Sequence, residues 1–276
     1  MDLIVFDLDG TLLNKKSQVS EHTRDTLQQL RRRNIAYTVA TGRTLQSARS
    51  LLDGQGFTLP HIYKNGVLTW RPESDVYSHS NLLTGAEIEA VLEAFLSVAV
   101  TPFIFTVEPS NRHVVYHLPM QNDSERRLAK IFSQDRGIEI LPVTAMPSDA
   151  EITNISALGA REAIEYVADL VKTEEHLMAY AGNAIEGESL CWIDVHHSAA
   201  SKGGAVANLK RDLGVSRIIC FGDSDNDLSM FAMADESYAP SNAKDAVRSV
   251  ATEVIGHHNE DGISRFLRKR FDLVMP

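Results

Sequence analysis

The sequence predicts an α/β protein: a doubly wound parallel sheet with an inserted α+β domain. Short apolar runs alternate with amphipathic helical segments at both ends of the 276-residue chain, which is typical of a parallel sheet covered on both faces. In the middle of the chain, strand candidates follow one another closely, which favours an antiparallel sheet. A chain of this length can form two domains, each with its own core.

The N-terminal segment has the pattern strand, helix, strand, helix, strand. Residues 3–6 are an apolar run, and Ser20 is a typical N-cap for a helix that ends near residue 33. Leu27 and Leu30 of this helix are expected to face inward. The next elements are expected at residues 35–40 (strand), 44–52 (helix) and 61–63 (strand).

The pattern then changes. Residues 67–70 and 76–79 flank "RPESD" and predict a hairpin, and "TGAE" at 84–87 is a capping box for the next helix. Further strands are expected at 103–107, 113–118, 151–158, 177–182 and 190–195, and helices at 122–132 and 161–172. We therefore expect an inserted α+β domain spanning residues 83–195.

The parallel pattern resumes after the insertion. A helix is expected at 202–213, ended by Gly214 as a C-cap, and a strand at 217–221. Shorter helices and strands up to residue 267 are expected to close the same sheet. The first domain would therefore be built from two chain segments, residues 1–82 and 196–276.

Composition limits the possible partners and locations. The formal net charge of −10 argues against nucleic acid or an anionic membrane as a partner. No apolar run approaches the ~20 residues of a membrane span, and no signal peptide is visible. Cys191 and Cys220 are expected to be buried small hydrophobes, since their spacing fits neither a metal site nor a disulfide framework. A cytoplasmic protein is expected, either a monomer or a dimer.

Polar side chains follow the predicted parallel strands where each strand ends. They are Asp7 and Asp9, Thr41 to Arg43, and Asp223 and Asp227, joined by Lys202 at the start of a helix. Ligands bind beyond the carboxyl ends of such strands, so one shared site is expected.

The residue types indicate phosphoryl transfer. Asp7, Asp9 and Asp223 would repel one another without a cation, and carboxylate oxygens suit Mg²⁺. Asp7 could then attack phosphorus as a nucleophile. Lys202, the Thr41 hydroxyl and the Gly42 backbone N–H would contact the phosphate oxygens. Gly203 and Gly204 would let the helix of Lys202 approach a phosphate closely.

Asp9 would act as the general acid and then as the general base. It would protonate the leaving alcohol and then deprotonate the water that opens the aspartyl-phosphate. Asp7 must be ionised and Asp9 protonated at the first step, which suits two close carboxylates with pKa values pushed apart.

Four motifs in this order resemble the haloacid dehalogenase-like phosphatases: "DLDGT" at 7–11, "TGR" at 41–43, "SKGGA" at 201–205 and "GDSDNDLSM" at 222–230. The place and length of the insertion resemble the Cof-type subgroup with a type IIB cap. The resemblance covers the predicted core, residues 1–82 and 196–276, and implies that residues 83–195 are a cap that sets substrate specificity and closes over the core.

The resemblance also implies roles for individual residues. Asp7 would be the nucleophile and a Mg²⁺ ligand, and Asp9 the acid/base that binds the metal through its main-chain carbonyl. Asp223 would be a further ligand, supported by Asp227. The phosphate contacts would be the Leu8 backbone, Thr41, Gly42, Lys202 and Asn226. "YKNGV" departs from the subgroup, which more often has a small residue in place of Lys64.

The reaction expected is Mg²⁺-dependent hydrolysis of small phosphorylated metabolites, and sugar phosphates follow from the resemblance alone. Two alternatives are a sugar phosphomutase, which uses the same aspartyl-phosphate, and a phosphometabolite-binding regulator without activity.

Simpler structural explanations stay open for some residues. Asp227 could cap the following helix, and Arg43 either touches substrate or forms a salt bridge at a helix start. Asn65-Gly66 could line the site, although Asn-Gly is first of all a turn signal. The basic run "RFLRKR" at 265–270 is expected to be the solvated face of the last helix.

Overall fold

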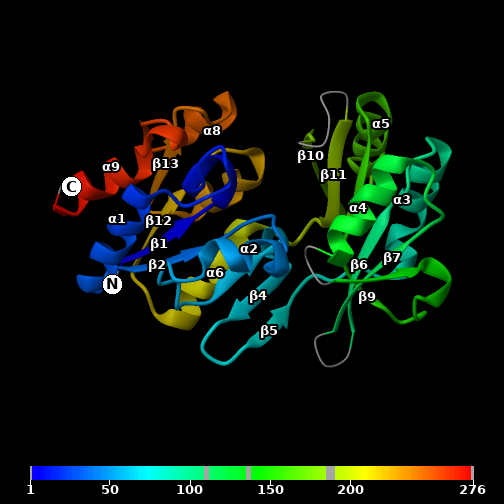
Figure 1. Ribbon diagram of the computed structural model, residues 1–276, viewed down its shortest axis with the longest axis horizontal. Coiled ribbons are helices and arrows are strands. Elements are labelled where there is room, and N and C mark those ends of the chain that lie inside the picture. Colours follow the sequence, from blue (N-terminus) through cyan, green and yellow to red (C-terminus); the bar gives the residue numbers. More distant parts are fainter. Residues whose placement is uncertain (1, 109–111, 135–137, 185–189, 275–276) are drawn as a thin grey trace. The chain divides into compact units, whose positions relative to one another are not determined.

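The computed structural model describes residues 2–108, 112–134, 138–184 and 190–274 of the chain (Figure 1). They divide into two compact units. Unit 1 comprises Met1–Ser78 and Ser201–Pro276, and unit 2 comprises His79–Ala200. Unit 2 extends a few residues beyond each end of the insertion expected at 83–195.

Unit 1 is built on a five-stranded sheet in the order β14-β13-β12-β1-β2, and every neighbouring pair is parallel. The central strands β1 and β12 come from opposite ends of the chain and lie side by side, as Figure 1 shows. The strands are β1 (Asp2–Phe6), β2 (Ala36–Val39), β12 (Arg217–Phe221), β13 (Glu236–Pro240) and β14 (Glu253–Ile255). The predicted parallel sheet is confirmed.

Helices cover both faces of this sheet. They are α1 (Glu21–Arg32), α2 (Leu45–Leu52), α6 (Lys202–Leu213), α7 (Leu228–Met233), α8 (Asp245–Val250) and α9 (Gly262–Arg270). Alternate residues of β1 enter different apolar clusters: Ile4 and Phe6 join one with α1 and α9, and Leu3 and Val5 join another with α6 to α8. This alternation follows from the two-residue period of a strand.

Capping residues lie at the ends of three helices in unit 1, and the sequence predicted two of them, Ser20 and Gly214. The Ser20 side chain accepts a hydrogen bond from the backbone N–H of Thr23, which begins α1. Thr44 caps α2 in the same way. Gly214 ends α6 in the left-handed conformation, with φ of 61°, where glycine carries no Cβ penalty.

The third predicted strand joins the parallel sheet only marginally. Residues 61–63 form β3 (His61–Tyr63), which pairs antiparallel with β4 (Leu68–Arg71) in a three-stranded sheet completed by β5 (Val76–His79). A single parallel bridge joins Ala40 to Ile62. The hairpin expected at 67–79 is present, and its first strand, β4, pairs with β3.

Unit 2 contains a six-stranded sheet in the order β10-β11-β9-β6-β7-β8. Its strands are β6 (Phe103–Glu108), β7 (Arg112–His117), β8 (Glu139–Pro142), β9 (Glu151–Ala160), β10 (Leu177–Asn183) and β11 (Leu190–His197). The predicted antiparallel pairing holds except between β7 and β8, which are parallel. Strand β8 was not predicted.

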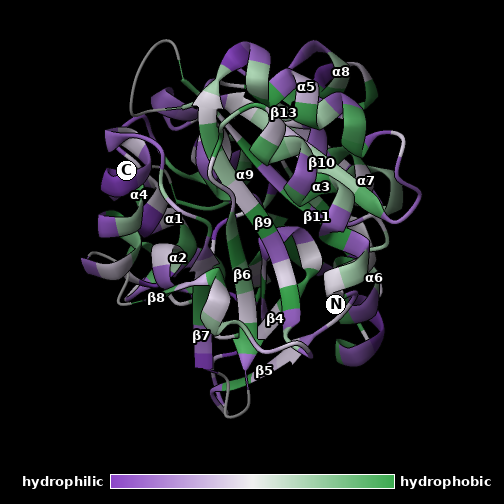
Figure 2. Cartoon of the chain, turned by 90° about the vertical axis from the view of Figure 1, so that its right-hand side faces the viewer, coloured by the Kyte–Doolittle hydropathy of each residue, from purple (hydrophilic) through white to green (hydrophobic). Residues whose placement is uncertain are grey.

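The helices of unit 2 are α3 (Gly85–Ser97), α4 (Asp123–Gln134) and α5 (Arg161–Val171). Helices α3 and α5 share one apolar cluster with β9, β10 and β11, and α4 packs on β6 and β7 in a second cluster. Figure 2 shows hydrophobic stretches along β6 and β7 and mixed colours on the helices. Among the described residues, no helix is both long and apolar enough to span a membrane.

Candidate active site

The two central strands of unit 1 bring Asp7 and Asp223 together. Phe6 pairs with Phe221 at the ends of β1 and β12, and the Asp7 N–H donates to the Phe221 carbonyl at 2.9 Å. Asp7 is the next residue after β1, and Asp223 lies two residues beyond β12. Because the strands are parallel and in register, both carboxylates emerge at the same edge of the sheet.

A tight turn after β1 explains the "GT" of "DLDGT". Gly10 has φ of +72°, and a Cβ there would lie 2.5 Å from the Asp223 carboxylate. The Thr11 hydroxyl donates to Asp223 Oδ1 at 3.0 Å. Glycine is needed for both the conformation and the space, and threonine orients the neighbouring carboxylate. Leu8 is fully buried in the core, so only its backbone is available to a ligand.

Lys202 joins the carboxylates. Its side chain is fully buried, and Nζ donates to Asp7 Oδ1 at 2.5 Å and to Asp227 Oδ1 at 2.7 Å. It is the first residue of α6, which Ser201 caps by accepting from the Gly204 N–H. A buried ammonium needs such partners, since its desolvation is costly.

The space beside Gly203 is occupied by protein. A Cβ on Gly203 would lie 2.1 Å from the Ser229 carbonyl oxygen, and the Gly203 N–H donates to Ser229 Oγ at 3.1 Å. Gly203 therefore lets α6 pack closely on α7, whereas we expected it to allow the approach of a phosphate. A Cβ on Gly204 would meet only Ser201 Oγ, at 3.2 Å.

Asp227 completes a capping box with Ser224 and is an ion-pair partner of Lys202. Its Oδ2 accepts from the N–H groups of Asp223 and Ser224 at 2.8 and 2.9 Å, while Oδ1 binds Lys202. It is fully buried. The side chain therefore shapes the turn that carries Asp223 and holds the lysine at the same time. It makes no capping hydrogen bond to the following helix, α7, so the capping interpretation is wrong for that helix.

Asp9 and Arg43 form a two-pronged ion pair. Arg43 Nε and Nη2 donate to the two carboxylate oxygens of Asp9, each at 2.6 Å. The Asp9 side chain is 55% exposed, so it is open to solvent and to a ligand. Hydrogen bonding to Asp9 raises the pKa of Arg43. Arg43 thus contacts the proposed acid/base directly.

The "TGR" turn begins where β2 ends. Thr41 is buried and donates its N–H to the Ile62 carbonyl at 2.9 Å, and its hydroxyl accepts from the Arg43 N–H at 3.2 Å. A Cβ on Gly42 would approach the Asn65 side chain at 3.1 Å. Asn226 Nδ2 donates to Oδ1 of the same Asn65 at 3.0 Å. The sequence left the role of Asn65 open, and these contacts place it against two of the predicted site residues.

The pKa values of the cluster reflect burial and surplus negative charge. Burial raises the pKa of Asp7 well above its usual value; repulsion from Asp227 and Asp223 adds to this, and Lys202 opposes it. Burial and the charge of Asp227 raise the pKa of Asp223 to about 6. Burial would lower the pKa of Lys202, but the charges of Asp227 and Asp7 outweigh it and raise it.

This donor set fits a divalent cation. Ligand oxygens of Asp7, Asp223 and Asp227 lie within 4.8 Å of one another, and a single lysine ammonium cannot neutralise three carboxylates. The Asp227 oxygens accept from the Lys202 ammonium and from two backbone N–H groups, which are fixed in place. Among the described residues, the Asp223 oxygens accept only from the hydroxyls of Thr11 and Ser224, which can turn toward another acceptor, so Asp7 and Asp223 are the side chains that would hold the ion. Hard carboxylate oxygens are the ligands that Mg²⁺ prefers.

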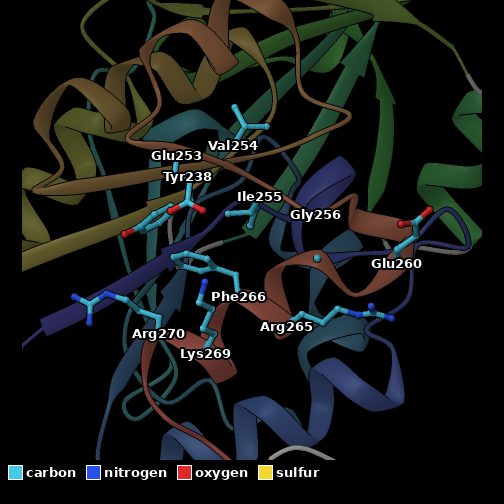
Figure 3. A pocket seen from close by; sticks show the side chains of 11 residues that line it. Tyr238, Glu253, Val254, Ile255, Gly256, Glu260, Arg265, Phe266, Lys269 and Arg270 are labelled. Atoms are coloured by element: carbon cyan, nitrogen blue, oxygen red, sulfur yellow. The ribbon is translucent and has the colours of Figure 1, made fainter.

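A pocket of about 660 Å³ lies elsewhere in unit 1 and shares no residue with this cluster. Figure 3 shows it between β14 and one face of α9, with Phe266 near Tyr238 and the side chains of Arg265 and Lys269 along the helix. The expectation that "RFLRKR" is a solvated face is wrong for Arg268, which is 1% exposed and binds Asp25 at 2.5 Å.

A family model described as haloacid dehalogenase-like hydrolase matches residues 4–267. The chain is similar to the 5-amino-6-(5-phospho-D-ribitylamino)uracil phosphatase of Bacillus subtilis strain 168, with 25% identity over 98% of each chain. It is also 28% identical to the HMP-PP phosphatase of Escherichia fergusonii, over 98% of this chain and 96% of that protein.

Solved structures match over nearly the whole chain. A haloacid dehalogenase-like hydrolase from B. subtilis superimposes with a TM-score of 0.78 and 24% identity, covering 97% of this chain and 99% of the other. A haloacid dehalogenase subclass IIB sugar phosphatase gives a TM-score of 0.75 at 21% identity, covering 99% and 100%. At these identities the likeness shows the fold.

Proposed function

Because this chain belongs to the haloacid dehalogenase-like hydrolase family, as its motifs predicted, we propose that it is a Mg²⁺-dependent phosphatase that forms an aspartyl-phosphate on Asp7. The family and its relatives named as phosphatases together support a phosphoric monoester hydrolase. The observation that carries the proposal is the contact of buried Lys202 with Asp7, beside Asp223 at the end of two parallel strands.

Each residue then has a defined task. A carboxylate oxygen of Asp7 attacks phosphorus and the bond from phosphorus to the ester oxygen breaks. Asp9, protonated on one oxygen while the other keeps its hydrogen bond to Arg43, gives its proton to that leaving oxygen. Asp9 next removes a proton from water, whose oxygen attacks the phosphorus of the aspartyl-phosphate. Phosphate leaves and the Asp7 carboxylate is restored.

The phosphate oxygens need donors and positive charge throughout. Lys202 supplies a charge that its two carboxylate partners hold in place, and Thr41, Gly42, Asn226 and the Leu8 backbone are the proposed donors. A Mg²⁺ held by Asp7 and Asp223 would neutralise their repulsion and polarise the phosphate. Asp9 would add its main-chain carbonyl.

We further propose that unit 2 selects the leaving group, and that sugar phosphates are the substrate class. The face of β9 to β11 opposite α3 and α5 carries Trp192, which is 41% exposed, and Asp194. Asp194 Oδ1 accepts from Asn154 and Ser156 at 2.6 and 2.7 Å. An exposed aromatic ring beside fixed hydrogen-bonding groups suits a polyhydroxylated ring.

Activity on p-nitrophenyl phosphate tests the chemistry. Turnover should stop with EDTA and return with Mg²⁺, and Asp7→Asn should abolish it while unfolding stays cooperative. Asp212→Asn, which alters a surface ion pair with Arg71, is the matched control and should retain activity. An active Asp7→Asn protein would refute the nucleophile assignment.

A panel of phosphorylated sugars, nucleotides and cofactors tests the substrate class. Trp192→Ala and Asp194→Asn should lower kcat/KM for the preferred substrate and leave p-nitrophenyl phosphate turnover nearly unchanged. Tyr166→Ala removes a similarly exposed aromatic ring from α5 and is the control. Interconversion of hexose 1- and 6-phosphates in the same panel would instead favour a phosphomutase.

A further inference from the structure

The turn at residues 64–66 ("KNG") contacts three chain segments that carry proposed phosphate-binding residues. Asn65 is 3% exposed and has φ of +54°. Its backbone N–H donates to the Thr41 carbonyl at 3.1 Å, and the Lys64 N–H donates to the Arg43 carbonyl at 3.1 Å. The turn therefore fixes the backbone of "TGR" at both ends.

The same turn abuts the start of α6. A Cβ on Gly66 would lie 2.3 Å from the Ser201 carbonyl oxygen, in a backbone conformation with φ of +104°. Ser201 precedes Lys202 and caps its helix. Only glycine allows this approach, so the turn also supports the helix that carries the buried lysine.

The Asn65 side chain makes the third contact. Its Oδ1 accepts a hydrogen bond from Asn226 Nδ2 at 3.0 Å. An amide nitrogen carries two hydrogens, so this bond uses one and leaves the other for a ligand. The buried Oδ1 of Asn226 has no hydrogen-bond partner among the described residues, so the bond to Asn65 is what holds the amide group.

We propose that Asn65 is a positioning residue, which rests on the proposed function: its side chain orients the Asn226 amide so that the second N–H points to a phosphate oxygen. A purely conformational role would need only a residue that tolerates positive φ, and glycine meets that need at least as well as asparagine. The two roles therefore separate in Asn65→Gly, which keeps the turn and removes the side chain.

The experiment is a double-mutant cycle with Asn65→Gly, Asn226→Ala and the double variant in the full chain. Steady-state kinetics with p-nitrophenyl phosphate, competitive inhibition by inorganic phosphate and thermal unfolding are measured for each. Asn65→Gly should lower kcat/KM about 3- to 10-fold, the scale of one hydrogen bond to a reacting group, and weaken phosphate inhibition. When Asn226→Ala is already present, the same change should alter kcat/KM less than about 2-fold.

Asn65→Ser is a second variant. Its hydroxyl is too short to reach Asn226, so kcat/KM should fall by the same factor as in Asn65→Gly. Wild-type kcat/KM in both variants of Asn65, or an equal loss when Asn226→Ala is already present, would overturn the positioning role while leaving the phosphatase intact. Absence of turnover by the wild-type protein with Mg²⁺ would instead overturn the proposed function and this inference with it.

Discussion

Arg43 donates two hydrogen bonds to the Asp9 carboxylate, one to each oxygen. A lysine cannot reproduce this two-pronged geometry. Arg43→Lys keeps the charge and loses the planar fork, so Asp9 should be held less firmly for proton transfer. We expect kcat to fall about tenfold, equal to about 1.4 kcal/mol. Steady-state kinetics measure the change.

Stability should hardly change in this variant. The Asp9 side chain is more than half exposed, and exposed ion pairs contribute at most about 1 kcal/mol. Arg71→Lys, which alters the exposed pair with Asp212, is the control and should leave kcat unchanged. Unaltered kcat in Arg43→Lys would show that Asp9 needs no fixed partner.

The ionised Asp223 carboxylate is a proposed metal ligand, but its burial beside Asp227 lowers the stability of the folded state. Burial and Asp227 raise its pKa to about 6 in the metal-free protein, above the usual value of about 3.9. The folded state therefore binds more protons than the unfolded state between these pH values, and stability falls as pH rises through that window. The pKa of Asp7 is also raised by burial, so this carboxyl adds to the fall in stability as pH rises.

Asp223→Asn should consequently stabilise the metal-free protein above pH 6 by about 1–2 kcal/mol. It should also flatten the pH dependence and lower kcat at least about 100-fold, because a proposed metal ligand is lost. Urea denaturation at pH 4, 6 and 8 in EDTA measures the stability. A variant less stable than wild type at pH 8 would contradict the surplus-charge argument.

At the scale of elements, the packing of α6 on α7 sets where Lys202 lies. Gly203→Ala would place a Cβ 2.1 Å from a backbone oxygen that cannot move aside freely, so we expect a loss of about 1–3 kcal/mol and a lower kcat/KM. Gly204→Ala is the matched control, since its Cβ would meet only one hydroxyl at 3.2 Å. Equal stability of the two variants would refute this account.

Local sequence signals predict an element well when its cause is local. Ser20, the Thr84–Glu87 box and Gly214 mark helix ends because each completes a hydrogen bond or conformation within one turn. Strand β8 was missed because "EILP" is short and only half-buried. Its pairing with β7 depends on a contact between segments that the sequence separates by a helix.

The candidate site follows the same rule. Asp7 and Asp223 were predictable because each lies within two residues of the end of an apolar strand, and parallel strands end at one edge of a sheet. The contact of Asn65 was not, because Asn-Gly is explained fully by a turn until Asn226 is placed beside it. The pairing of Arg43 with Asp9 is likewise a contact between two turns, and no local pattern in either segment encodes it.

At the scale of the whole molecule, the proposed chemistry and the proposed selection of substrate belong to different units with separate cores. The apolar clusters of unit 1 and those of unit 2 share no member among the described residues. Unit 2 is also one continuous stretch, His79–Ala200, while unit 1 requires two stretches to complete its sheet. Separate cores and a continuous chain are the conditions for independent folding.

We therefore expect residues 79–200, expressed alone, to fold and to unfold cooperatively with a stability of about 5 kcal/mol or more. Circular dichroism during urea denaturation measures this, and the fragment should not hydrolyse p-nitrophenyl phosphate because Asp7, Lys202 and Asp223 are absent. As a control, Ile155→Ala within the fragment should lower stability by about 2–5 kcal/mol, since Ile155 is fully buried in its core. A fragment without a cooperative transition would show that the core of unit 2 depends on unit 1. The two units would then fold together, even though the proposed chemistry and the proposed substrate selection lie in different units.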